Sequence, residues 1–69
     1  MQNSENSPLL EISETGTNWD SLKTLAENQG GYFTSRQALG FGYSHPNQVY
    51  HVNKGNWQRV EFGIYRLPW

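Results

Sequence analysis

The sequence predicts a small, mainly helical domain that ends in a β-hairpin, and three observations lead to this fold class. The 69 residues hold 35% hydrophobic side chains, enough for one small core and no more. Three segments carry the start and stop signals of helices. Two short runs rich in aromatic and branched residues, at 57–60 and 64–67, then follow on either side of a glycine-containing turn, which is typical of a hairpin.

Composition excludes several classes of protein. The chain has no cysteine, so it has neither disulfides nor a thiolate metal site, which fits a reducing compartment, and we expect a cytoplasmic protein. No secretory signal or apolar run long enough to cross a membrane is present. A chain of this size buries only about 60% of the surface that its unfolded form exposes, which leaves little room for a catalytic pocket. We therefore expect neither an enzyme nor a cofactor.

Charge divides the chain at residue 18. Residues 1–18 hold three carboxylates, no Lys or Arg and no aromatic side chain, which predicts a flexible acidic N-terminal arm. Residues 19–69 hold every aromatic residue and five cations against Asp20, Glu27 and Glu61, a net charge of +2. This second segment is expected to form the folded domain. Its charge permits a polyanionic partner without identifying one.

The first helix is predicted to start after Asn18 and to run for about ten residues. Asn18 is a good N-cap, and Asp20 suits the positive end of a helix. Gly30-Gly31 ends the run. A brief extended pair, Tyr32-Phe33, follows.

The second and third helices are predicted to be separated by a tight turn. Thr34 and Gln37 have the spacing of a capping box, which predicts a short second helix. Gly40-Phe41-Gly42 ends it, since each glycine costs about 1 kcal/mol inside a helix. Ser44 is the next N-cap, and the third helix is expected to run to about Lys54.

Helix, helix, turn, helix, hairpin is the order of a winged helix-turn-helix with three helices and a two-stranded wing. The wing strands are predicted to be joined through residues 61–63. The apolar residues expected to form the core are Trp19, Phe33, Leu39, Trp57, Ile64 and Tyr65.

The third helix is predicted to present one packed and one polar face. At 100° per residue, Val49 and Val52 lie on the side expected to face the first two helices. In a helix-turn-helix the opposite face meets the major groove, where amide, imidazole, phenol and ammonium groups suit base edges. An ordinary solvated helix face is the alternative. The residues predicted to read DNA bases are Asn47, Tyr50, His51 and Lys54.

Phosphate ligands are expected to flank this face. Arginine side chains alternatively serve as solvated charges or as partners of nearby carboxylates. Glu61, at the expected hairpin tip, would repel a phosphate. Phe62 beside it either packs back on the domain or marks an exposed contact patch. The predicted phosphate-binding residues are Arg36, Ser44, Arg59 and Arg66.

The sequence does not contain the residue patterns of metal, nucleotide-binding or catalytic sites. His45 and His51 are six positions apart and face different ways on one helix, with no cysteine or paired carboxylate to join them, so no metal site is predicted. The glycine pairs lack the third glycine and the lysine of nucleotide-binding loops. The chain holds a single Asp and no catalytic triad spacing, so no catalytic residues are predicted.

Four spaced motifs resemble the N-terminal winged-helix domain of AbiEi-type antitoxins, over about residues 19–68. They are LKTLAENQGGYFTSRQAL at 22–39, GYS at 42–44, GNWQRV at 55–60 and GIYRLP at 63–68. In that family the domain precedes an antitoxin domain, binds DNA upstream of its own toxin–antitoxin operon and represses it. The resemblance implies that Ser44 opens the recognition helix, that Arg36 and Arg59 lie at basic positions, and that residues 63–66 form the second wing strand.

The sequence departs from the family pattern at two places. Where relatives commonly carry several arginines in the recognition helix, this chain has Pro46, Asn47 and Asn53, and before the wing glycine it has Glu61-Phe62. We therefore expect weaker phosphate affinity. The chain ends one residue after Leu67-Pro68, where the family linker begins, which favours a fragment of a longer protein.

The leading hypothesis is a sequence-specific double-stranded DNA-binding module of a bacterial transcriptional regulator, an antitoxin-like autorepressor of its own operon. The alternative is a protein-interaction or dimerisation module that positions an attached domain, with Phe62, Tyr50 and Trp69 in contact with protein. Double-stranded DNA is the expected partner. A C-terminal domain absent from this chain and a homodimer are further candidates, and no membrane partner is expected.

Overall fold

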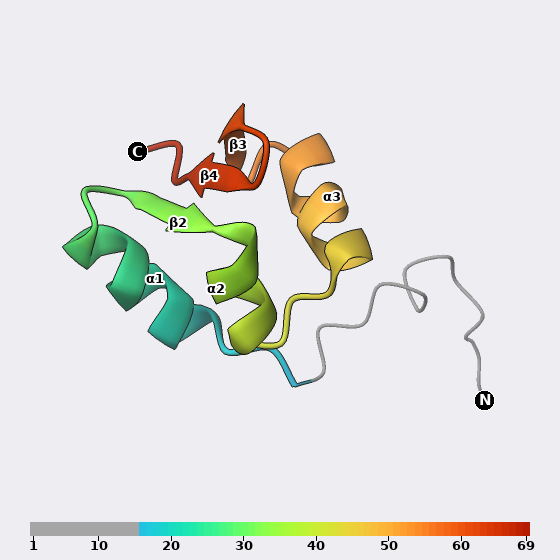
Figure 1. The fold of residues 1–69 in the computed structure, drawn as a ribbon, viewed down its shortest axis with the longest axis horizontal. Helices are drawn as coiled ribbons and strands as arrows, with labels where there is room; N and C mark the ends of the chain where they lie inside the picture. The colour runs from blue at the N-terminus through green and yellow to red at the C-terminus, as the bar shows by residue number, and fades with distance from the viewer. Residues whose placement is uncertain (1–15) are drawn as a thin grey trace.

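The computed structural model describes residues 16–69, which form three helices and one three-stranded antiparallel sheet in a winged-helix arrangement (Figure 1). The flexibility predicted for the acidic arm falls largely on residues 1–15, outside the described residues. No helix in the described part combines the length and apolar character that crossing a membrane requires. The elements in chain order are α1 (Trp19–Asn28), β2 (Tyr32–Thr34), α2 (Ser35–Gly40), α3 (His45–Asn53), β3 (Gln58–Glu61) and β4 (Ile64–Arg66).

The predicted helix starts are confirmed by their caps. Asn18 and Ser44 each accept a hydrogen bond from the backbone N–H three residues on, at 3.1 and 3.3 Å. Thr34 and Gln37 form the predicted capping box, in which each side chain accepts from the other residue's backbone N–H. These bonds satisfy N–H groups that the first turn of a helix leaves without a partner. The three helix starts therefore follow from local sequence.

The sheet has three strands, which corrects the prediction of a two-stranded wing. β4 lies between β2 and β3 and runs antiparallel to both. The pair predicted as a brief extended link belongs to β2, where Phe33 lies opposite Tyr65 of β4. Backbone bonds from Ser35 N to Gly63 O (2.8 Å) and from Leu67 N to Gly31 O (2.8 Å) continue this pairing at both ends. The β3–β4 hairpin, which we call the wing, is thereby joined directly to the segment between α1 and α2.

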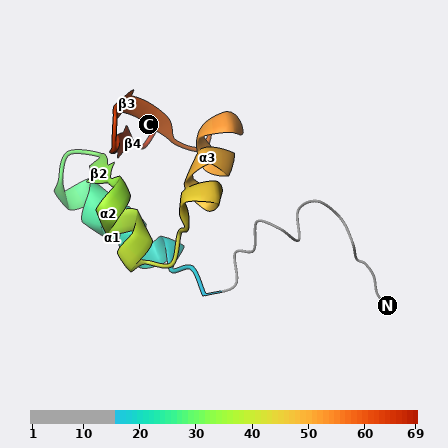
Figure 2. The ribbon, with the colours of Figure 1, turned by 45° about the vertical axis from the view of Figure 1, so that its right-hand side comes forward.

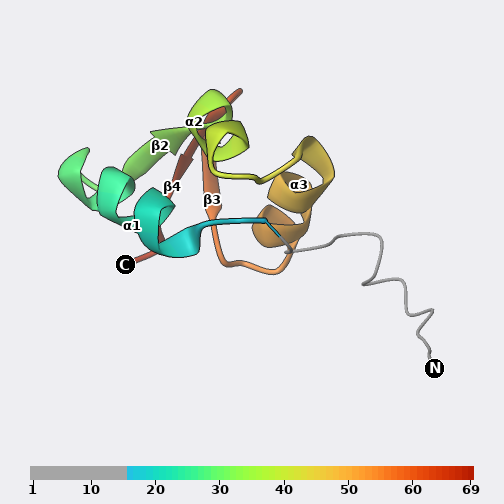
Figure 3. The same cartoon turned by 90° about the horizontal axis from the view of Figure 1, so that it is seen from below.

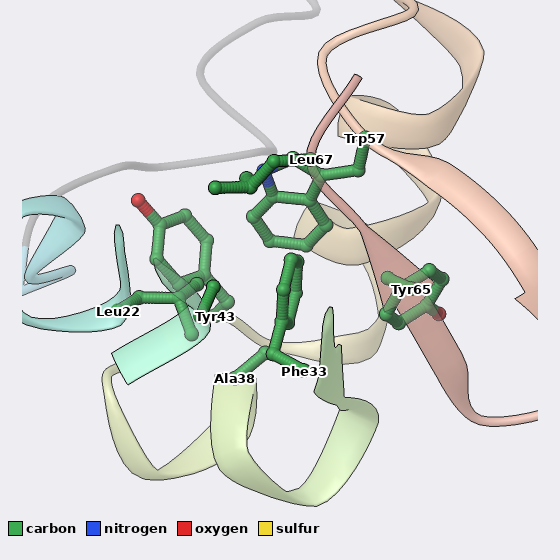
Figure 4. Close-up of a cluster of buried hydrophobic side chains, with 8 residues drawn as sticks. Leu22, Phe33, Ala38, Tyr43, Trp57, Tyr65 and Leu67 are labelled. Carbon is green, nitrogen blue, oxygen red and sulfur yellow. The ribbon is translucent and has the colours of Figure 1, made fainter. Parts of the chain in front are cut away.

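Trp57, directly before β3, lies at the centre of the core. Its ring centroid is 4.9 Å from that of Phe33, 5.1 Å from Tyr43 and 5.7 Å from Tyr65. Figure 4 shows Phe33 edge-on to the Trp57 ring, an arrangement that aromatic pairs favour. The buried apolar cluster consists of Leu22, Ala26, Phe33, Ala38, Tyr43, Trp57, Tyr65 and Leu67.

Three of the predicted core residues are not fully buried, although Trp19 packs against the core cluster. Leu39 is exposed, and Trp19 and Ile64 are only partly buried. Because α2 has only six residues, it turns one small side chain, Ala38, into the core, and the next position points away. Tyr43, in the turn after α2, supplies the aromatic ring that the prediction omitted.

The described chain begins in contact with the turn between α2 and α3. The Asn18 N–H donates to the Phe41 carbonyl at 2.9 Å. Gly42 has a φ of +94°, and a Cβ there would collide with the Gly16 carbonyl. Glycine at this turn therefore provides both a left-handed backbone and a close approach of two chain segments.

Candidate nucleic-acid interface

A buried glutamine holds α3 against α2. The Gln48 side chain is fully buried. Its Oε1 accepts from the Ser35 hydroxyl at 2.6 Å, and its Nε2 donates to the carbonyls of Tyr43 at 2.8 Å and Ser35 at 3.3 Å. Turning the Gln48 side chain away from α2 would break these bonds, and each buried polar atom left without a partner costs about 1–3 kcal/mol. Gln48 thus fixes which side of α3 faces the interior.

This orientation corrects the predicted faces of α3. Asn47, predicted to read bases, is only 4% exposed, whereas Val49, predicted to pack, is 46% exposed. Val52 alone of the two valines packs against the core. The prediction assumed that the apolar side chains would take the inward positions. The hydrogen bonds that Gln48 makes place an amide there instead and turn Val49 outward.

His51, also predicted to lie on the outward face, is partly buried and packs on Trp57 of the core. Its ring stacks on Trp57 with 4.7 Å between centroids and lies edge-to-face with Tyr43 at 5.5 Å. Asn56 Nδ2 donates to His51 Nδ1 at 2.9 Å. These contacts make the partly buried imidazole part of the junction between α3 and β3.

The outward face of α3 carries a shallow hollow of about 550 Å³. Tyr50 and Lys54 lie on it as predicted, and the Lys54 ammonium is 5.9 Å from the centroid of the Tyr50 ring. Val49, Asn53 and His45 belong to the same face, although sequence reasoning did not select them. Its full lining is His45, Pro46, Val49, Tyr50, Asn53 and Lys54.

A second hollow, of about 230 Å³, lies between α3 and the wing. It is lined from the wing by Arg59, Phe62 and Tyr65, and from α3 by His45 and Val49. Because His45 and Val49 line both hollows, the helix and the wing form one continuous surface. We call it the α3–wing surface, made of His45, Pro46, Val49, Tyr50, Asn53, Lys54, Ser35, Arg59, Phe62, Gly63 and Tyr65.

The α3–wing surface is lined by cations, and none of the described carboxylates lines it. Lys54 and Arg59 lie on it, and the Arg59 guanidinium carbon is 6.0 Å from the Tyr65 ring centroid. Glu61 lines a separate hollow formed between β2 and the wing. Asp20 and the other helical carboxylate belong to α1, which lies to the left of α3 in Figures 2 and 3 and lines neither of these two hollows. This distribution favours an anionic ligand at the α3–wing surface.

The other residues predicted to bind phosphate lie outside these two hollows. Arg36 is exposed on α2, and Ser44 is the exposed N-cap of α3. Arg66 is half-buried on β4, and its guanidinium carbon lies 5.6 Å from the ring centroid of Tyr32. Of the four predicted phosphate-binding residues, only Arg59 is brought to the α3–wing surface.

Aromatic side chains line another hollow, of about 440 Å³, on the side of α3 where His51 packs. Trp19, Trp57 and Trp69 contribute to it, and Trp69 is 67% exposed. Phe62, at the wing tip, is 98% exposed. Among the described residues, no group of three or more His, Cys, Asp or Glu side chains is placed to hold a metal ion.

One comparison with known proteins gave a match. The sequence model of the family described as "Transcriptional regulator, AbiEi antitoxin" matches residues 20–68, which includes nearly all of α1 and every later element. The match confirms the resemblance found in the four sequence motifs, and the description names a regulatory role. Neither the curated proteins nor the solved structures gave a match.

Proposed function

Because the chain belongs to the AbiEi antitoxin family of transcriptional regulators, we propose that it binds double-stranded DNA through the α3–wing surface. The observation that carries the proposal is the continuity of that surface through His45 and Val49. A helix and an adjacent wing on one surface suit a duplex, with the helix in the major groove and the wing on the flanking backbone. Lys54 and Arg59 supply the positive charge that phosphates attract.

The roles within this site differ from the sequence prediction. Tyr50 and Lys54 keep the outward positions predicted for them, and Asn53 takes the place that Asn47 was expected to fill. An exposed asparagine can form paired hydrogen bonds with an adenine edge. Lys54 and Arg59 contact phosphates on either side of the inserted helix.

The regulatory role that we propose is repression of the chain's own toxin–antitoxin operon. The family description supports transcriptional regulation, and the family resemblance supplies the finer role. The DNA upstream of the encoding operon is the duplex on which this role is tested. A promoter fused to a reporter should be repressed by the wild-type chain and released by the variants described next.

The DNA-binding proposal is tested by a salt titration of binding to duplex DNA. Lys54→Ala and Arg59→Ala should each weaken binding to all duplexes and reduce the slope of log affinity against log salt by about 0.9. Lys23→Ala is the matched control, because it removes the same charge from α1, which does not line the α3–wing surface. If Lys54→Ala and Arg59→Ala bind duplex DNA as the wild type does, or if the affinity does not change with salt concentration, the proposal fails.

A second candidate function, protein association, is favoured by the exposure of Phe62 at the wing tip. A single exposed aromatic ring on a rigid hairpin is a common anchor of protein interfaces. Sedimentation equilibrium of the wild-type chain should then reveal self-association that Phe62→Ser abolishes. A monomer at all concentrations, with unchanged behaviour in the variant, removes self-association as the role of Phe62.

A further inference from the structure

Val49 lies where the two hollows of the α3–wing surface meet, outside the apolar core cluster. It lines both hollows, is 46% exposed, and lies outside the cluster of buried and packed apolar side chains. Its neighbours along the outward face of α3 include His45, Asn53 and Lys54. An exposed branched side chain on the helix proposed to enter the groove is positioned to bury its methyl groups against a ligand.

The edges of base pairs in the major groove offer one apolar group, the C5-methyl of thymine. We propose that Val49 contacts this methyl group, so that the chain selects major-groove sites containing an A·T pair. This inference rests on the DNA binding proposed above and names the base that the site recognises. Lys54 and Arg59 on the same surface, together with the absence of the described carboxylates from its lining, make an anionic duplex a better occupant than an apolar peptide.

Asn53 strengthens the assignment to an A·T pair. It lies one helical turn after Val49 and lines the same hollow. Four residues advance an α-helix by about 6 Å, close to two steps of about 3.4 Å between stacked base pairs. The Asn53 amide is therefore placed to bind N6 and N7 of an adenine, while Val49 reaches a thymine about two base-pair steps away.

The test replaces single thymines by deoxyuridine, which lacks only the C5-methyl group. Duplexes bound by the wild-type chain are first selected from random-sequence DNA, and each thymine of the selected site is then substituted in turn. At one or more positions the substitution should weaken wild-type binding about three- to fivefold, the value of one buried methyl group. Val49→Ala should bind the thymine duplex more weakly by a similar factor and should bind both duplexes equally.

Val60→Ala is the matched control. Val60 is also 46% exposed, but it lines the separate hollow between β2 and the wing. This variant should keep the wild-type preference for thymine over deoxyuridine. Salt-dependent binding with no preference at any position overturns the inference and leaves the DNA-binding proposal intact. A preference retained in Val49→Ala also overturns it, and a chain with no salt-dependent binding to duplex DNA overturns both proposals.

Discussion

At the residue scale, one buried amide decides which side chains of α3 face outward. Gln48 connects α3 to both the start of α2 and the turn between the two helices through three hydrogen bonds. The energy of these bonds depends on burial, since a buried polar atom without a partner costs far more than an exposed one. The orientation of α3 therefore depends on Gln48 more than on either of its valines.

Replacing Gln48 by leucine should destabilise the fold by about 2–4 kcal/mol. The apolar side chain leaves the Tyr43 carbonyl and the Ser35 hydroxyl without their partner. Urea unfolding followed by circular dichroism measures the change. Gln29→Leu is the control, because Gln29 also takes part in three hydrogen bonds but is exposed, and it should cost less than about 1 kcal/mol. Equal costs for the two variants would contradict the role assigned to burial.

At the element scale, the turn between α2 and α3 sets where α3 begins. Gly42 adopts a left-handed backbone and lies against the Gly16 carbonyl, which leaves no room for a side chain. Gly55, after α3, has a similar φ of +82° but open space around it. Comparing substitutions at the two glycines therefore separates the free-energy cost of a left-handed backbone from the cost of a steric collision.

Gly42→Ala should therefore destabilise the fold more than Gly55→Ala. Both variants incur the left-handed strain of about 1–2 kcal/mol, and only Gly42→Ala must also displace a neighbouring backbone segment. Thermal unfolding of the two variants and the wild type measures the difference. A Gly55→Ala melting temperature at or below that of Gly42→Ala would rule out the collision.

Comparison of the predicted and observed helices and strands shows how much of this fold the sequence predicts. The three helix starts were predicted correctly because caps are local, encoded within four residues of the helix start. β2 was missed as a strand because a three-residue strand is specified by its partner β4, which lies far along the chain. Asn47 and His51 were placed outside for a related reason. The helix face depends on contacts of Gln48 and Trp57 with other elements, which periodicity does not encode.

At the scale of the whole molecule, the fold depends on one aromatic cluster. Trp57 contacts rings from β2, from β4 and from the turn before α3, so its removal affects every layer at once (Figure 4). A domain of this size has a total stability of only about 3–8 kcal/mol. Truncating a buried tryptophan costs about 3–5 kcal/mol, which is comparable to the whole.

Trp57→Ala is accordingly expected to leave a large share of the chain unfolded at room temperature, and Trp57→Phe to keep it folded with reduced stability. Near-ultraviolet circular dichroism and a thermal melt measure both effects. Trp69→Ala provides the control, because that ring is 67% exposed and its loss should change stability by less than about 0.5 kcal/mol. A cooperative melt of Trp57→Ala close to that of the wild type would place the centre of the core elsewhere.

The contact between Gly16 and Gly42 also determines where the chain can be shortened. A version starting at Trp19 would lose the cap of α1, the bond from Asn18 to Phe41 and the backbone neighbour of the turn that precedes α3. One starting at Gly16 would keep all three. An affinity tag or a fused partner joined directly at residue 18 would lie against the turn between α2 and α3, just before the helix proposed to bind DNA. A loss of DNA binding in such a fusion would therefore indicate a steric effect at that turn.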